Sequence, residues 1–192
     1  MKSLRTLRKQ AGLTLIEAMV WLALLGVVIG GTLYYQSRSD ASQKSTQAAA
    51  DLTYMASKAK AFYKPSGSYS ALTAANLNKM ALVNPPMVYD GSNLKDAWGN
   101  TMSVAGGTLT FAISVGGSTN PLDKEACTNI ASTMVNNATS IRIGSAAAVT
   151  TTGATQGQVS GGNAYKTAGT VPDAAAMATG CNESNPIIAI QF

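Results

Sequence analysis

Residues 13–64 carry two hydrophobic patterns, one after the other. From Leu13 to Tyr35 run 23 residues whose only charged side chain is Glu17. About 20 apolar residues in an α-helix are enough to cross a bilayer. The pattern therefore predicts a helical segment over residues 13–35 that spans a membrane.

The second pattern has the period of a helix with one apolar face. After Tyr35, apolar residues recur at steps of three or four: Ala48, Leu52, Met55, Ala59 and Phe62. This spacing marks one side of a helix, and Pro65 and Gly67 end it. A single helix over residues 13–64 would be about 78 Å long, against about 30 Å for a bilayer core. Its second half is therefore expected to pack its apolar face on a soluble domain.

The remaining residues, 65–192, are expected to form that domain, with a short helix around residues 71–80 and a turn at Asp90-Gly91. Apolar and polar residues alternate over 98–104 and again over 109–115. Gly106-Gly107 between them suits a tight turn, so the pattern predicts an antiparallel hairpin with one apolar face. That face is the natural partner of the amphipathic helix. The fold class predicted is α+β.

Further elements are predicted towards the end of the chain. Asn120-Pro121 is expected to begin a helix that runs to Met134, with Asn120 as its N-cap. Residues 172–178 suggest a short helix, and residues 187–192 suggest a buried, central strand. The Gly-, Ala-, Ser- and Thr-rich residues 144–170 fit either a disordered loop or short strands joined by turns, and we favour the strands.

The charge distribution argues against nucleic-acid binding. The net charge is +5, but four of the 14 basic residues lie in the first nine: Lys2, Arg5, Arg8 and Lys9. From residue 13 onward ten basic residues face nine acidic ones, and a nucleic-acid interface would need clustered cations on the folded part. Positive charge before the apolar run instead places the N-terminus in the cytoplasm and the remainder outside it.

The composition also argues against an enzyme or a metalloprotein. The chain has no histidine and two cysteines, which excludes Ser-His-Asp catalysis and Cys₄ zinc sites. The acids of the domain are isolated along the chain. We therefore expect no catalytic residues, no cofactor and no metal.

Cys127 and Cys181 are expected to form a disulfide, because the domain lies outside the cytoplasm. The alternative is two buried thiols. The bond would close a loop of 55 residues, worth about 4 kcal/mol in the chain-entropy model.

Three interpretations fit the apolar N-terminal segment. A secretory signal peptide has a shorter apolar stretch, and no A-x-A site follows this one. A simple anchor has no use for Glu17, whose burial near the bilayer centre costs roughly 2.5–3.5 kcal/mol. In the third interpretation the chain is cut after Gly12. The new amine at Leu13 is then neutralised by Glu17 of a neighbouring copy, which sets the register between subunits.

The residues around this predicted cut resemble the class III signal of type IV pilins and pseudopilins: Gly12-Leu13-Thr14-Leu15-Ile16-Glu17. The resemblance implies a leader at residues 1–12, removed by a prepilin peptidase between Gly12 and Leu13. It also implies N-methylation of Leu13 and an assembly role for Glu17. The implied partners are identical pilin subunits and the pilus assembly machinery of the bacterial inner membrane.

Three glycines interrupt the apolar half of the helix: Gly26, Gly30 and Gly31. Gly26 and Gly30 match GxxxG, which permits close helix approach. Glycine is also simply common in membrane helices. The resemblance adds a third option, local melting during filament assembly.

The second half of the chain resembles the type IVb class, which includes toxin-coregulated and bundle-forming pilins. The resemblance lies in residues 111–117 and 122–127, and in Leu13 as the first mature residue. It implies the type IV pilin fold, a globular head at residues 65–192 and a disulfide-closed D-region at residues 127–181. The implied function is the major subunit of an extracellular pilus used in adhesion or aggregation, with a membrane-held precursor whose head is periplasmic. The alternative is a minor pilin or a secretion-system pseudopilin.

Overall fold

The computed structural model describes residues 15–145, 149–151 and 157–192. The chain divides into two compact units, one up to Asp40 and one from Ala41 to Phe192, here called the head. Helix α1 (Leu15–Tyr63) contributes to both units. It is followed by the 3₁₀ turn η1 (Lys64–Ser66) and by Gly67, whose φ of 70° gives a left-handed C-cap. The predicted long helix and its end are confirmed.

A five-stranded antiparallel sheet forms the centre of the head. Its strands lie in the order β4 (Val104–Gly106), β5 (Phe111–Gly116), β10 (Pro186–Gln191), β6 (Ser140–Ser145) and β9 (Asn163–Lys166). β10 pairs with β5 on one side and β6 on the other. The prediction of a central, buried strand near the end of the described chain is confirmed.

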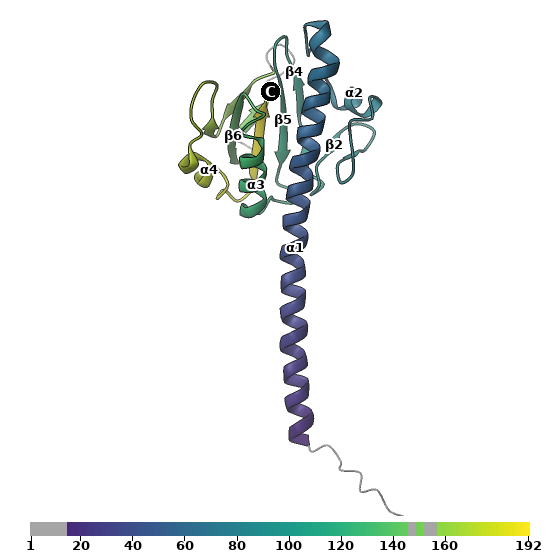
Figure 1. Ribbon diagram of the computed structural model, residues 1–192, viewed down its shortest axis with the longest axis vertical. Coiled ribbons are helices and arrows are strands. Elements are labelled where there is room, and N and C mark those ends of the chain that lie inside the picture. Colours follow the sequence, from purple (N-terminus) through teal and green to yellow (C-terminus); the bar gives the residue numbers. More distant parts are fainter. Residues whose placement is uncertain (1–14, 146–148, 152–156) are drawn as a thin grey trace, which may run out of the picture. The chain divides into compact units, whose positions relative to one another are not determined.

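Smaller elements surround this sheet (Figure 1). Helix α2 (Ala74–Lys79) precedes a three-stranded sheet of β1 (Val88–Tyr89), β2 (Leu94–Lys95) and β3 (Thr101–Met102). The predicted turn at Asp90 joins β1 to β2. Strands β7 (Val149–Thr151) and β8 (Val159–Gly161) pair with each other, so the described part of 144–170 forms short strands, as favoured.

Helices α3 (Lys124–Met134) and α4 (Ala174–Gly180) both begin at an aspartate cap. The Asp123 carboxylate accepts a hydrogen bond from the backbone N–H of Ala126 at 2.6 Å. The prediction of Asn120 as the cap of α3 is wrong. Asn120 instead donates its side-chain amide to the carbonyl of Trp98 at 2.7 Å, so the chain enters the helix three residues later than predicted.

The head core forms between α1, α3 and the sheet. The predicted apolar face of α1 is buried at Leu52, Met55 and Ala59, each with no exposed surface. Phe62, predicted on the same face, is 58% exposed. It lies one residue before the end of α1, where Tyr63 and not Phe62 packs against the core.

The hairpin prediction is right for its second strand and wrong for most of its first. Of the predicted residues 98–104, only Val104 belongs to β4, and Thr101–Met102 form β3, which pairs with β2 in the smaller sheet. Two further details differ. β4 pairs with β5 as expected, with Gly106 opposite Phe111, but the turn takes up four residues and leaves Leu109 82% exposed. β5 is also buried on both faces. The reason is that Val159 of β8 packs with Ala112 and Ala189 on the second face of the sheet.

Candidate functional site

The first half of α1 presents apolar side chains on all sides. Leu15 is 74% exposed, Val27 75% and Leu33 61%. Within the described residues one helix is long and apolar enough to cross a membrane, and it is this one. A helix that is apolar all round requires a lipid or protein environment. The described chain does not provide that environment for residues 15–36.

Glu17 lies in the first turn of α1. A carboxylate there is favoured by the positive end of the helix dipole. Gly12 and Leu13, the predicted processing residues, lie outside the described residues. The pairing of Glu17 with a neighbour's Leu13 amine therefore stays a prediction.

The three glycines of the apolar half have no packing neighbour among the described residues. A methyl group added at Gly26, Gly30 or Gly31 would meet nothing within 4 Å. Gly26 and Gly30 are four residues apart and so share one face of the helix. The face that they share is therefore open to close contact with another helix.

Cys127 and Cys181 form the predicted disulfide. It joins α3 to the residue that follows α4, with the two Cα atoms 5.7 Å apart. Both cysteines are buried, at 0% and 2% exposure. Gly180 lets α4 approach β6 closely, since a Cβ at this position would lie 2.7 Å from the carbonyl oxygen of Ile143. Strands β6 to β9 and helix α4 lie within the loop that the disulfide closes.

A polar contact that the sequence did not reveal ties α3 to α1 within the head. The side-chain amide of Asn129 donates to Ser45 Oγ at 2.9 Å and to Thr46 Oγ1 at 3.2 Å. Ser45 is fully buried. Ser45 lies seven residues before Leu52 and so on the same face of α1, which indicates its burial. No feature of the sequence indicates Asn129 as its partner.

Four of the isolated acids of the head have structural roles. Asp123 and Asp173 cap helices, and Asp96 is buried at 3% exposure, where it accepts hydrogen bonds from Trp98, Asn100 and Gly116. Asp90 lies in the β1–β2 turn. There, hydrogen bonds from the backbone amides of Asn93 and Ser92 hold the pKa of its carboxyl below the ordinary value.

Two family comparisons bear on this arrangement. Residues 41–190, more than three quarters of the chain, match the family described as PilS N terminal. The chain belongs to the PilS family. Residues 7–33 match the prokaryotic N-terminal methylation motif, which covers the predicted cleavage site and most of the apolar helix. No curated protein matches the chain.

The two matches identify a type IV pilin-like protein. A long apolar N-terminal helix, antiparallel sheets and the Cys127–Cys181 disulfide fit the type IV pilin fold. Pilin-like families are structural subunits and not enzymes. The methylation motif implies processing by a prepilin peptidase and assembly into pili, and it fits a membrane-anchored precursor that becomes part of an extracellular pilus.

Proposed function

We propose that this PilS-family protein is the major subunit of a type IVb pilus. One observation carries the proposal: a prepilin motif leads into a helix whose apolar side chains are exposed on every side. Such a helix leaves lipid only for another dry environment, which copies of the same helix supply. Polymerisation packs residues 13–35 into the fibre core and leaves the heads on its surface.

Cleavage between Gly12 and Leu13 prepares the subunit for this packing. It creates a positive amine at Leu13, which is then methylated. Glu17 of a neighbouring subunit neutralises that amine, so two buried charges compensate each other and fix the axial register. The favourable pair forms only when two subunits are correctly aligned. Gly26 and Gly30 add a flat face on which another helix can pack closely.

The precursor lies in the bacterial inner membrane with its N-terminus in the cytoplasm. The four basic residues before residue 10 support this orientation. The globular part that follows the helix, residues 65–192, then folds in the periplasm, where Cys127 and Cys181 can be oxidised. Residues 127–181 form the D-region of the head. The similarity of residues 111–127 to type IVb pilins supports the subclass, and the fibre serves adhesion or aggregation.

The decisive experiment compares fibres sheared from cells with and without this gene. Electron microscopy gives fibre abundance, and intact mass spectrometry gives the state of the recovered subunit. Abundant fibres lost on deletion, built from a chain that begins at methylated Leu13, would establish a major pilin. A processed chain that stays in the membrane while fibres persist would instead identify a minor pilin or pseudopilin. A chain that still begins at Met1 would refute the whole proposal.

A further inference from the structure

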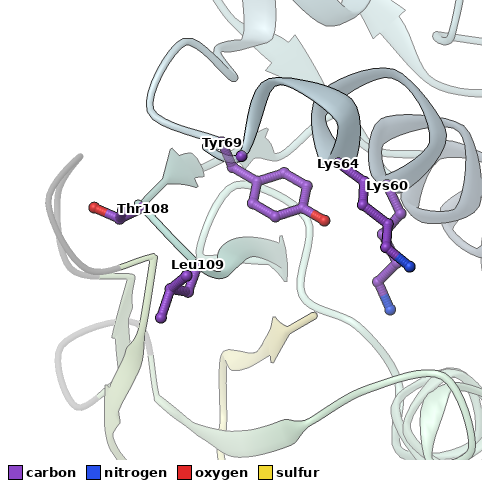
Figure 2. Close-up of a pocket in the computed structure, with 6 residues that line it drawn as sticks. Lys60, Lys64, Tyr69, Thr108 and Leu109 are labelled. Carbon is purple, nitrogen blue, oxygen red and sulfur yellow. The ribbon is translucent and has the colours of Figure 1, made fainter.

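A pocket of about 420 Å³ lies in the head at the C-terminal end of α1 (Figure 2). Three segments line it: the last turn of α1 with the 3₁₀ turn, the loop after that turn, and the β4–β5 turn. The lining residues are Lys60, Lys64, Gly67, Tyr69, Thr108 and Leu109. A volume of this size falls in the range of small-molecule sites.

Two lysine side chains lie at one side of this pocket. Lys60 and Lys64 are four residues apart and so share a helix face, and Figure 2 shows both amines on the side towards which the Tyr69 hydroxyl points. Lys60 is half-buried. Its Nζ donates to the carbonyl of Asn137 at 3.3 Å, and burial lowers the pKa of this lysine. None of the six lining residues is acidic, so an anion brought here gains attraction without displacing a carboxylate of the lining.

The wall of the pocket opposite the two lysines is apolar, and contacts within the head fix its position. The Tyr69 ring packs on Phe111 with ring centroids 5.0 Å apart. The Tyr69 backbone N–H donates to the carbonyl of Gly107 at 2.9 Å. A Cβ at Gly106 would lie 1.9 Å from the Tyr69 carbonyl oxygen, so glycine is required for this approach. Leu109 is 82% exposed at the rim. A ligand with an apolar body would cover a large side chain that otherwise faces water.

We propose that this pocket binds a small organic anion, namely a carboxylate carried on a ring or short chain with an apolar face. The carboxylate contacts Lys64 and Lys60, and the body rests on Tyr69 and Leu109. A neutral apolar ligand would gain no attraction from the two ammonium groups, and a bare inorganic anion would leave the apolar wall uncovered. The ligand is either a free apolar acid or an acidic sugar unit, which share this chemistry. The site consists of head residues alone and does not depend on polymerisation.

Protein-observed NMR of the full processed chain in a nonionic micelle tests the proposal. The probes are cyclohexanecarboxylate, glucuronate, cyclohexanemethanol and acetate. We expect one of the two ring acids to cause saturable shifts at Gly67, Thr108 and Leu109, and to bind at least tenfold more tightly than the neutral alcohol and acetate. Tighter binding of cyclohexanecarboxylate identifies a free apolar acid, and tighter binding of glucuronate identifies an acidic sugar. Equal binding of the alcohol, or no saturable shift with either acid, would overturn the proposal.

Variants then separate the pocket from general attraction to a basic surface. Lys64→Gln should weaken binding of the acid roughly tenfold, as expected for one charge-assisted hydrogen bond. Leu109→Ser should weaken it several-fold and leave the fold intact, because the side chain is exposed. The matched control is Lys58→Gln, because Lys58 is an exposed lysine of α1 that lies outside the pocket, near the Tyr54 ring. A loss with Lys58→Gln as large as that with Lys64→Gln would show that the charge acts non-specifically, and would refute the assigned site.

Discussion

Asp96 Oδ2 accepts a hydrogen bond from the backbone N–H of Gly116 at 2.9 Å. The bond joins the turn before β3 to the end of β5. The same carboxylate accepts from the backbone N–H groups of Trp98 and Asn100. A buried charge is tolerated when its acceptor positions are filled in this way. The Asp96 carboxylate thus links the three-stranded sheet to the five-stranded sheet.

Replacing Asp96 with alanine is expected to lower the free energy of unfolding by about 3 kcal/mol. The reason is that three backbone donors lose a charged acceptor in a site that water does not reach. Thermal and denaturant unfolding of the processed chain measure the loss. Asp90→Ala is the control, since Asp90 also accepts two backbone hydrogen bonds but is exposed. A loss as large for Asp90→Ala would contradict the role of burial.

Removing the disulfide is expected to destabilise the head by about 2–4 kcal/mol. Cys127 and Cys181 are 54 positions apart in sequence, so the bond restricts a large part of the unfolded chain. The measurement compares Tm with and without reductant, for the natural chain and for the Cys127→Ala, Cys181→Ala double variant. Reductant should lower Tm in the first and leave the second unchanged. An unchanged Tm in the natural chain would show that the bond contributes nothing.

Elements with a clear hydrophobic pattern could be predicted from the sequence, and the exact positions of their ends could not. The 49-residue helix α1 repeats its pattern over many residues, so each position supports the next, and the six-residue strand β10 is marked by its run of apolar residues. A step of three or four residues from Ala59 reaches either Phe62 or Tyr63, and it is Tyr63 that packs against the core, which the spacing does not decide. Leu109 continues an alternating strand pattern in the sequence, but in the structure it lies in the turn between β4 and β5.

Of the features of the candidate sites, the disulfide could be predicted from the sequence, and the pocket and the Asn129–Ser45 contact could not. The disulfide was predictable because the compartment and the count of two cysteines left one intramolecular pairing. The pocket at the end of α1 was not, because the folding of β4 and β5 is what places Leu109 and Lys64 in the lining of one pocket. The Asn129–Ser45 contact is another long-range pairing. No local pattern marks such contacts, since they depend on how α3 packs against α1.

Asp51 is expected to make the head less stable as pH rises from acid to neutral. Burial raises the pKa of its carboxyl above 3.8, and Oδ2 has no hydrogen-bond partner among the described residues. Between pH 3.8 and the folded-state pKa, the native chain holds a proton that the unfolded chain has released, so the free energy of unfolding falls through this interval. Asp51→Asn should therefore stabilise at pH 7 by about 0.5 kcal/mol, or roughly 1–2 °C in Tm, after allowance for solvent screening.

The advantage of Asp51→Asn should disappear below pH 3.8, which unfolding between pH 3 and pH 7 can measure. Asp90→Asn provides a control of opposite sign. Because the pKa of Asp90 is lowered in the folded state, this variant should be destabilised at neutral pH, and its deficit should vanish as pH falls. Parallel profiles for the two variants would be inconsistent with burial as the cause at Asp51.

Glu17→Val is expected to leave cleavage and membrane insertion intact and to abolish fibres. Valine keeps the segment apolar, so insertion has no added cost. However, the Leu13 amine of each neighbour then enters the fibre core without a counter-charge. An uncompensated buried charge costs several kcal/mol at every subunit contact, and the penalty recurs along the fibre.

Gly12→Ser is the matched control, because a larger side chain at the cleavage position should instead leave an uncut precursor. Intact mass and electron microscopy of the two variants separate failure of processing from failure of assembly. Normal fibres from Glu17→Val would refute the neutralising role of this glutamate.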